Sequence, residues 1–231
     1  MSEKIGQLVE TLKTEQERMR TAEFKALQAQ INPHFLYNSL DSINWLARRG
    51  DVQKTTEMVT ALTTFFRIGL SKGRDLITVR EEVEHVRSYL VIQKIRYENQ
   101  FDYSFCVDPE TEKYFVPKLI LQPLVENALY HGIKLCDRKC LLMIQVLSRE
   151  DEIEIEVLDN GAGMDEETLR SVREAMEHTG ENRTNSYGVV NVNDRIRILA
   201  GPQYGLVFTS EKGVGTSAKI VLPCLLYTSP S

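Results

Sequence analysis

The 231-residue chain contains no apolar run near the ~20 residues needed to span a bilayer, and its N-terminus has no signal-peptide core. It also has no excess of positive charge, because 28 Lys and Arg stand against 33 Asp and Glu, a net charge of −5. A protein that binds nucleic acid through bulk electrostatics would carry the opposite sign. These absences predict a chain of cytosolic character with no nucleic-acid partner. They also fit the soluble part of a longer membrane protein.

Cysteine is scarce, and of Cys106, Cys136, Cys140 and Cys224 only the middle two lie close in sequence. With His131 nearby, that pair would supply three metal ligands, but a fourth is missing and the spacing fits no common zinc pattern. We therefore predict no metal site there and expect reduced thiols. The apolar share of 42% and charged share of 26% are typical of a globular protein and exclude a disordered or collagen-like chain.

Residues 1–72 have a helical pattern, interrupted where Gly50 and Asp51 combine a helix terminator with a good N-cap. This junction predicts a tight turn between two antiparallel helices. We expect a coiled-coil helix over residues 1–26 and a helical hairpin over residues 27–73. The coiled-coil expectation depends on apolar residues at coiled-coil spacing in a charged background, namely Ile5, Leu8 and Leu12.

After Gly73 the pattern alternates between helices and strands, which predicts an α+β sandwich over residues 74–223. Thr78 and Glu81 match a capping box that starts a helix. In residues 152–157 Glu alternates with Ile and Val, so one face of the strand is buried and the other faces solvent. We take residues 224–231 as an appendage of non-native origin. The expected helices are 78–97, 123–134, 166–177 and 189–200, and the expected strands are 101–107, 141–147, 152–158, 205–210 and 217–222.

Pro33 lies inside the first helical pattern, where it removes a hydrogen bond and forces a kink or a fresh helix start. After Pro33 the apolar residues form two flanks that leave a narrow polar strip, as in a four-helix bundle. One hairpin supplies two helices, so the bundle implies a homodimer. His34 lies on the polar strip, and Asn38 is one turn away.

A neutral imidazole at this position needs orientation more than activation, because its ordinary pKa is near 6.5. Asn38 and Asp41 are the candidates that fix its tautomer. His34 is therefore the candidate phosphoryl acceptor, with Asn38 as the second catalytic candidate. The alternative is an ordinary polar histidine of a helical bundle.

A second candidate segment follows Pro123, where Asn127 and His131 share one face of the predicted helix and Lys134 follows at the next turn. An Asn amide oxygen is a suitable hard ligand for Mg²⁺, which keeps most of its shell as water and phosphate oxygen. His131 and Lys134 can meet phosphate charge. Taken alone, the same pattern also fits a solvated helix face.

The third candidate segment comes directly after a strand and contains Asp159, Gly161, Gly163 and Met164. The two glycines permit a sharp turn and the close approach of a flat ring to the backbone. Asp159 can accept a hydrogen bond from an exocyclic amine, which distinguishes adenine from guanine, and Met164 can pack on the ring. An ordinary Asp-Asn-Gly turn between a strand and a helix fits the spacing equally well.

The fourth group starts at Gly188, which opens a helix whose backbone amides favour phosphate, and Asn191 lies on the same helix. Gly215 and Thr216 precede the final strand, where the backbone can pass near a ligand; a Gly-rich hairpin loop is the alternative. The polar stretch 178–186 has no periodicity and is expected to be a lid. The chain contains no Walker-type phosphate loop.

Four segments appear in one order: QINPHFLYN at 30–38, PLVENA at 123–128, DNGAGM at 159–164 and GVVNV at 188–192. In this order they resemble the phosphoacceptor motif, the N box, the G1 box and the second glycine box of sensor histidine kinases of the LytS/YesM type. The resemblance covers residues 1–223. It departs at Ser186, where the first glycine of the second glycine box is usual, and this affects the phosphate-side contacts of the lid.

The resemblance implies a helical dimerisation hairpin joined to a gyrase/Hsp90-like domain that binds ATP and Mg²⁺. His34 would be the phosphorylated residue, Asn127 the Mg²⁺ ligand and Asp159 the adenine contact. Such families act in two-component signal transduction and pass the phosphoryl group to an aspartate of a response regulator. Their full-length members carry an N-terminal membrane sensor, so we expect a cytoplasmic portion of a membrane protein. The alternatives are an ATPase in which Glu126 activates water, and a non-catalytic dimeric binding module.

Overall fold

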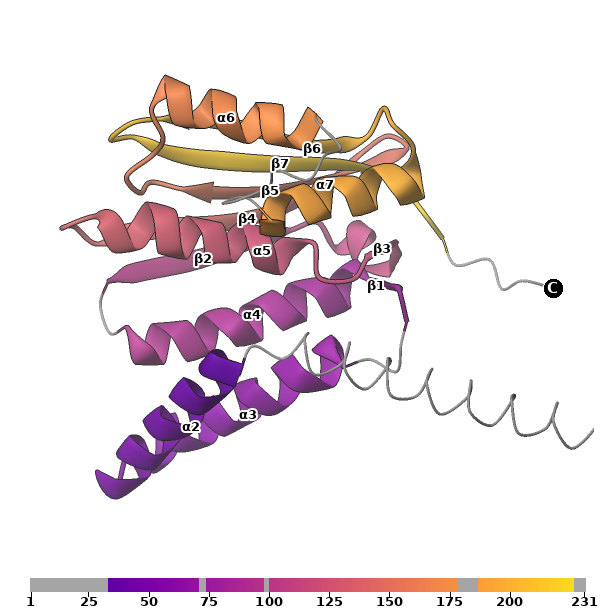
Figure 1. The fold of residues 1–231 in the computed structure, drawn as a ribbon. Helices are drawn as coiled ribbons and strands as arrows, with labels where there is room; N and C mark the ends of the chain where they lie inside the picture. The colour runs from indigo at the N-terminus through magenta and orange to yellow at the C-terminus, as the bar shows by residue number, and fades with distance from the viewer. Residues whose placement is uncertain (1–32, 71–73, 98–99, 178–186, 227–231) are drawn as a thin grey trace, which may run out of the picture. The chain divides into compact units, whose positions relative to one another are not determined.

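The chain divides into two compact units, Met1–Val52 and Gln53–Ser231, and each is described here by itself. The division places the second predicted helix with the larger unit, whereas the hairpin over residues 27–73 remains a prediction. The predicted coiled coil over residues 1–26 and the predicted lid lie outside the described residues. The computed structural model describes residues 33–70, 74–97, 100–177 and 187–226 (Figure 1).

In the smaller unit, helix α2 (Pro33–Arg48) starts at the proline, whose fixed φ suits a first helical turn. It is followed by a sharp turn in which Gly50 has a φ of 73°, a left-handed conformation that favours glycine. Helix α3 (Val52–Gly69) begins directly after this turn. The predicted turn at Gly50 is therefore confirmed, and the antiparallel pairing of the two helices stays a prediction.

The larger unit is built on one five-stranded sheet with the order β2-β4-β5-β7-β6. Strands β2 and β4 pair in parallel, and the remaining neighbours pair antiparallel. All five strands were predicted, and their ends shift by at most two residues. Their bounds are β2 (Phe101–Val107), β4 (Cys140–Arg149), β5 (Glu152–Asp159), β6 (Gly205–Glu211) and β7 (Gly215–Pro223).

One face of the sheet forms the core. In β5, Ile153, Ile155 and Val157 are at most 2% exposed, and the alternate glutamates lie on the opposite face. On that opposite face Lys219 pairs with Glu154 at 3.1 Å. The alternation of Glu with apolar residues therefore predicted the two faces of this strand correctly, since side chains of a strand alternate between faces.

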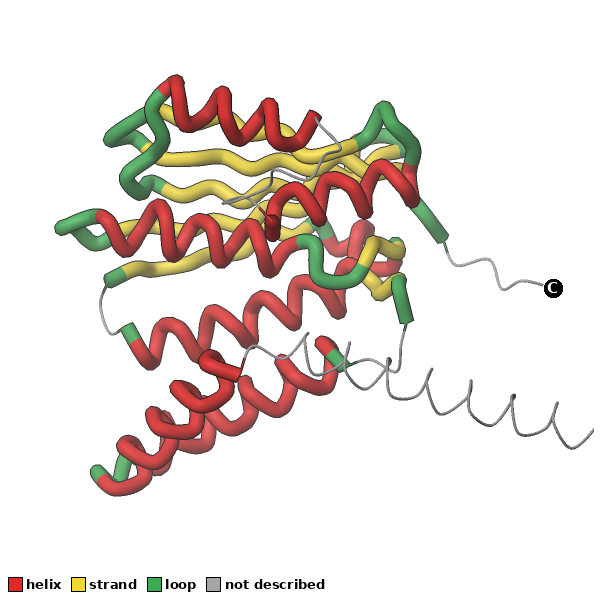
Figure 2. The backbone as a smooth tube through the Cα atoms, viewed as in Figure 1, coloured by secondary structure: helices red, strands yellow, loops and turns green. Residues whose placement is uncertain are grey.

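Helices cover the buried face of the sheet and make a two-layer α/β sandwich (Figures 1 and 2). Thr78 accepts a hydrogen bond from the Glu81 amide and Glu81 returns one to the Thr78 amide, so the predicted capping box is confirmed. The covering helices are α4 (Val79–Arg96), α5 (Leu121–Asn127), α6 (Glu166–Glu177) and α7 (Tyr187–Ala200).

A small antiparallel sheet of β1 (Leu76–Thr78) and β3 (Phe115–Pro117) was not predicted. A 3-10 helix, η1 (Pro109–Lys113), precedes β3 and was missed as well. Strands of three residues are too short to show the alternation on which a prediction from sequence depends. Close by, the Phe115 amide donates to the carbonyl of Leu225 at 2.9 Å, so this part of the predicted tail is bonded to the fold.

Buried polar groups join α4 to the start of α5. The Glu82 carboxylate is 1% exposed and accepts hydrogen bonds from the amides of Leu119 (2.9 Å) and Leu121 (2.8 Å). These amides would otherwise lack partners at the start of α5. Burial raises the pKa of Glu82, and these amide bonds act against that shift.

The end of α3 is attached to α4 and to the chain before α5. The rings of Phe65 and His85 stack with centroids 4.4 Å apart, and Lys118 Nζ donates to the Gly69 carbonyl at 2.7 Å. Burial lowers the pKa of His85 to about 4. Across the described residues, no helix combines the length and the apolar character that crossing a membrane requires.

Replacing Ile155 by Ala tests the assignment of the core. Ile155 is 1% exposed in the central strand, so the variant should lose about 3 kcal/mol of unfolding free energy in urea denaturation. The matched control is Val207→Ala on the edge strand β6, where the side chain is 57% exposed and the loss should stay below about 0.5 kcal/mol. Equal losses for the two variants would contradict the assigned core face.

Candidate active site

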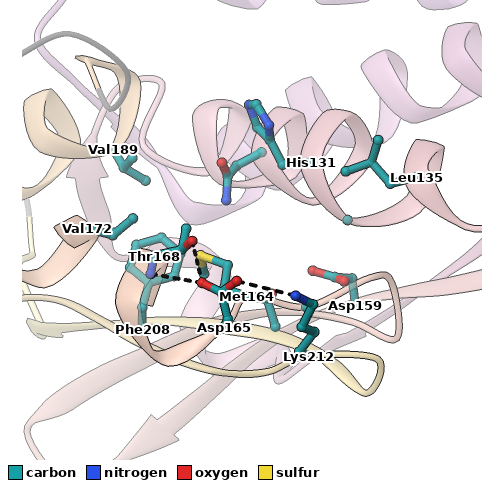
Figure 3. A pocket seen from close by; sticks show the side chains of 14 residues that line it. His131, Leu135, Asp159, Met164, Asp165, Thr168, Val172, Val189, Phe208 and Lys212 are labelled. Carbon is teal, nitrogen blue, oxygen red and sulfur yellow. Dashed lines mark hydrogen bonds and ion pairs between the residues drawn. The ribbon is translucent and has the colours of Figure 1, made fainter. Parts of the chain in front are cut away.

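A cavity of about 500 Å³ opens between the α5 region, the turn after β5, and the strands β6 and β7 (Figure 3). This volume lies within the ~300–1,000 Å³ of small-molecule sites. Six residues predicted as ligand contacts line it: Asn127, His131, Asp159, Gly163, Met164 and Thr216. Eight lining residues were missed: Gly132, Leu135, Asp165, Thr168, Val172, Val189, Phe208 and Lys212.

Asp159 ends β5 and presents a mostly buried carboxylate to the cavity. Its Oδ1 accepts a hydrogen bond from the Gly161 amide at 2.8 Å. Burial raises the pKa of Asp159 to about 6, while hydrogen bonds from the backbone of Gly161 and Thr216 act against the rise. A buried carboxylate with spare acceptor capacity is suited to one specific donor of a ligand.

The turn after Asp159 packs against the end of the α5 region without space for side chains. A Cβ on Gly161 would lie 2.5 Å from the Gly132 carbonyl carbon. The Ala162 amide donates to the Gly132 carbonyl oxygen at 3.0 Å, which ties the two segments together. A Cβ on Gly132 would in turn lie 2.7 Å from Asp159 Oδ1. The glycines of this turn were predicted from sequence, but their partner Gly132 was not.

The hairpin between β6 and β7 closes the other side of the turn. The Met164 amide donates to Ser210 Oγ at 2.8 Å, and Ser210 Oγ donates to the Gly215 carbonyl at 2.9 Å. Gly163 has a φ of 64°, and a Cβ there would overlap the carbonyl of Glu211. Gly215 does not line the cavity; a Cβ there would overlap the Asp159 carbonyl.

The predicted helix 123–134 is regular only up to Asn127. It continues as the π-helical turn η2 (Ala128–Gly132) and the 3-10 turn η3 (Ile133–Leu135). π-helical turns occur mostly as single turns, frequently at functional sites. Here the turn brings Gly132 against the Asp159 segment while Asn127 and His131 both line the cavity.

Four other predicted residues do not line the cavity, and their roles toward a ligand remain predictions. Lys134 Nζ lies 2.9 Å from the Tyr97 hydroxyl and 3.8 Å from the centre of the Tyr130 ring, a placement that does not support phosphate contact. The 3-10 turn after Gly132 puts Lys134 there. The remaining three are Gly161, which is buried in the turn, and Gly188 and Asn191, which are exposed on α7.

The charged rim of the cavity is formed by Asp165 and Lys212, which lie 3.4 Å apart (Figure 3). Asp165 also caps α6, because its Oδ1 accepts bonds from the Thr168 hydroxyl at 2.6 Å and the Thr168 amide at 3.1 Å. These bonds and the Lys212 ammonium lower the pKa of Asp165. An Asp three residues before a Thr at a helix start is a capping signal visible in the sequence.

His34 lies on α2, in the smaller unit, and its side chain is exposed. Asn38 Nδ2 lies 3.0 Å from His34 Nε2. An amide nitrogen can only donate, so this contact fits the neutral tautomer that carries its proton on Nδ1 and accepts at Nε2. Of the two residues predicted to fix the tautomer, Asn38 makes this bond.

Strands β4 to β7, helices α5 to α7 and all residues that line the cavity fall within one family match. Residues 116–225 match the model of the histidine kinase-, DNA gyrase B-, and HSP90-like ATPase family. Residues 22–101 match the histidine kinase family. The chain therefore belongs to the histidine kinases, and the predicted fold class is confirmed.

Curated relatives support the same family. The sensor histidine kinase YesM of Bacillus subtilis is 38% identical over 224 residues, which are 97% of this chain and 37% of the relative. The sensor protein LytS of Bacillus cereus is 34% identical over 206 residues, 89% of this chain and 34% of the relative. The chain thus spans about a third of their length. A histidine kinase domain from an Erythrobacter litoralis blue-light activated kinase has a TM-score of 0.46 at 18% identity, over 87% of this chain and 90% of that one.

Replacing Gly163 by Ala tests the close packing of the turn. The variant should lose about 3 kcal/mol of unfolding free energy, because a left-handed φ costs about 1 kcal/mol and the overlap with Glu211 adds about 2 kcal/mol. Gly213→Ala is the matched control, since Gly213 has a φ of 83° and no atom within 4 Å of a Cβ. Its loss should be about 1 kcal/mol in the same urea titration. Equal losses of unfolding free energy for the two variants would contradict a steric overlap between a side chain at Gly163 and Glu211.

Asp159→Asn should change the pH dependence of stability. The pKa of Asp159 is about 6, above its ordinary 3.8, so its protonated form favours folding. The stability it contributes is present at about pH 4 and is lost as the pH rises through about 6. The variant does not titrate, so it should match the wild type near pH 4 and exceed it by about 2 kcal/mol near pH 7.5.

Asp165→Asn provides a control of opposite sign, because hydrogen bonds from Thr168 and the Lys212 charge lower the pKa of Asp165. That variant should be less stable than the wild type near neutral pH and approach it as the pH falls. Unfolding curves recorded at several pH values provide both comparisons. Parallel pH profiles for wild type and Asp159→Asn would contradict the raised pKa.

Proposed function

We propose that the chain is an ATP-dependent protein-histidine kinase that transfers the γ-phosphoryl group of ATP to Nε2 of His34. The observation that carries the proposal is that Asn127, Asp159 and Met164 line one cavity within the ATPase family match. The matched histidine kinase region contains an exposed histidine whose Nε2 lies 3.0 Å from the amide nitrogen of Asn38. The cavity supplies a nucleotide site, and the histidine supplies a nucleophile.

Adenine recognition is assigned to Asp159 and the residues around it. The ionised carboxylate accepts a hydrogen bond from the exocyclic amine of adenine. Because the carboxylate is buried, a ligand that offers it no donor would bind with a less favourable free energy. Met164 packs on the ring, and Val172 and Phe208 add apolar surface to the same cavity. This arrangement favours adenine over a base that presents a carbonyl at that position.

Asn127 is the proposed ligand of Mg²⁺. The described residues hold no group of three or more His, Cys, Asp or Glu side chains placed to bind a metal. A metal held mainly by the protein therefore does not fit, whereas Mg²⁺ carried by ATP phosphates and water needs only one or two protein oxygens. When bound, Mg²⁺ would neutralise phosphate charge beside Asn127 and His131, which line the cavity.

His34 acts as the nucleophile. Its neutral ring carries the proton on Nδ1, so Nε2 attacks the γ-phosphorus while the bond from phosphorus to the bridging oxygen breaks. The electron pair of that bond leaves with ADP, and the product is phosphohistidine. Asn38 orients the ring before attack and releases Nε2 as the new bond forms. Catalysis comes mainly from positioning.

The alternative function, an ATPase in which Glu126 activates water, receives less support. Glu126 does not line the cavity. Its Oε1 accepts a hydrogen bond from Gln122 Nε2 at 2.9 Å. Burial raises the pKa of Glu126. A buried carboxyl group that is bonded to Gln122 and does not line the cavity is poorly placed to bind the attacking water.

The proposed partners follow from the same assignment. A homodimer would bury apolar side chains exposed on α2, where Tyr37, Leu40 and Trp45 are 68%, 47% and 51% exposed. An aspartate of a response regulator would accept the phosphoryl group from His34. We further propose that this chain is the cytoplasmic portion of a membrane-anchored sensor.

Incubation with γ-labelled ATP and Mg²⁺ tests the proposed function. Wild type should acquire a label that is stable in base and labile in acid, as a phosphoramidate is, and His34→Gln should abolish it. Arg48→Gln, an exposed substitution at the other end of α2, is the control and should label like wild type. Free labelled phosphate released equally by wild type and His34→Gln would instead support the ATPase. A protein that neither takes up nor releases label would support a non-catalytic binding module.

A further inference from the structure

Two cysteines lie at the ends of the loop that leaves the cavity wall. Cys136 follows the 3-10 turn η3, and Cys140 is the first residue of β4. Cys140 is 2% exposed, whereas Cys136 is half-buried. The other two cysteines lie elsewhere, Cys106 on β2 and Cys224 just after β7. The first pair therefore differs from the others in its place beside the candidate active site.

The contacts of the two thiols connect them to the cavity. Cys136 Sγ donates to the Gly132 carbonyl at 3.5 Å, and Gly132 lines the cavity. Cys140 Sγ lies 3.8 Å from the carbonyl of Asn160, the residue after Asp159. Burial and then the neighbouring Cys136 thiol raise the pKa of Cys140, so the two sulfurs are near neighbours at the two ends of this short loop. The two thiols thus contact the backbone of Gly132 and of Asn160, the two segments that meet at Asp159.

A metal does not explain this pair, because the described residues offer no third ligand beside it. Packing alone explains a buried Cys140 but gives no reason for a second, more accessible thiol close to it. Two adjacent thiols of unequal exposure are the arrangement in which one sulfur is oxidised first and the second resolves it.

We propose that Cys136 and Cys140 form a reversible oxidation site, at which a hydroperoxide joins them in a disulfide that alters the nucleotide cavity. The Cys136 thiolate attacks one peroxide oxygen, the O–O bond breaks, and Cys136 becomes a sulfenic acid while the leaving hydroxide takes a proton and becomes water. The Cys140 sulfur then attacks the Cys136 sulfur, the S–O bond breaks, and a second water leaves with the Cys140 proton. In total the thiols lose two electrons and two protons, and hydrogen peroxide becomes two waters.

The two sulfurs have different surroundings that fit these different roles. Burial raises the pKa of Cys140 to about 11, so its thiol stays protonated near neutral pH and reacts slowly with peroxide by itself. Cys136 is the more accessible of the two and meets the oxidant first. The loop from the end of η3 to the start of β4 holds the two cysteines four positions apart, so the second sulfur is close to the sulfenic acid as soon as that acid forms.

The disulfide would act on the cavity through the backbone. It removes the S–H donor at the Gly132 carbonyl and the S–H group near the Asn160 carbonyl, and it shortens the loop between η3 and β4. The Gly161 segment packs on Gly132 without spare space, so a shift of Gly132 moves the turn that presents Asp159. Weaker nucleotide binding is the expected consequence, and this part depends on the proposed function.

Trypsin offers a direct test, because Arg138 and Lys139 lie between the two cysteines. The test protein carries Cys106→Ser and Cys224→Ser, so that only the proposed pair remains. After treatment with hydrogen peroxide and blocking of free thiols, tryptic peptides containing Cys136 and Cys140 should stay joined, at a mass lower by two hydrogen atoms. Dithiothreitol should separate them. A further Cys140→Ser change should leave Cys136 as a sulfenic acid or a more oxidised form, with no joined peptides.

Separate peptides in the peroxide-treated test protein would overturn the proposal. Binding of a fluorescent ATP analogue gives the second measurement, where oxidation should weaken the affinity about tenfold, as expected for the loss of one or two hydrogen bonds, and dithiothreitol should restore it. Joined peptides with unchanged affinity would contradict the effect on the cavity. If the reduced protein binds no analogue, the nucleotide function fails together with that effect, while joined peptides would still establish the oxidation site.

Discussion

The backbone contact between Gly132 and the Asp159–Gly161 turn is the constraint on which the candidate active site depends. It joins the end of the α5 region to the end of β5 with no space for a side chain at Gly161, and the Ala162 amide bonds to the Gly132 carbonyl across it. This contact sets how far Asn127 lies from Asp159 across the cavity. The adenine end and the phosphate end of the proposed site therefore depend on one glycine contact.

The parts of the site that depend on local spacing could be predicted from the sequence. His34 and Asn38 are four residues apart on one helix, so their hydrogen bond follows from helical geometry. Asp159 was located because an alternating strand ends there and a glycine turn follows. In such cases the chemistry of the residue type and the period of the element are sufficient.

The parts that depend on tertiary contact could not be predicted. Val172 and Phe208 line the cavity from α6 and β6, but in the sequence they look like any other core residues. Lys134 was expected to contact phosphate because of its charge and spacing. The change from α-helix to π-helical and 3-10 turns places Lys134 beside Tyr97. The same turns bring Gly132 against Asp159 and Gly161, which are far from it in the sequence.

The central claim is that the glycine contact presents a buried Asp159 carboxylate to the exocyclic amine of adenine. The most direct measurement compares the affinities of the chain for ATP and for inosine triphosphate, which carries a carbonyl in place of that amine. The account predicts that ATP binds at least about tenfold more tightly, because the inosine carbonyl would face a buried acceptor without a proton between them. Equal affinity for the two nucleotides would contradict it.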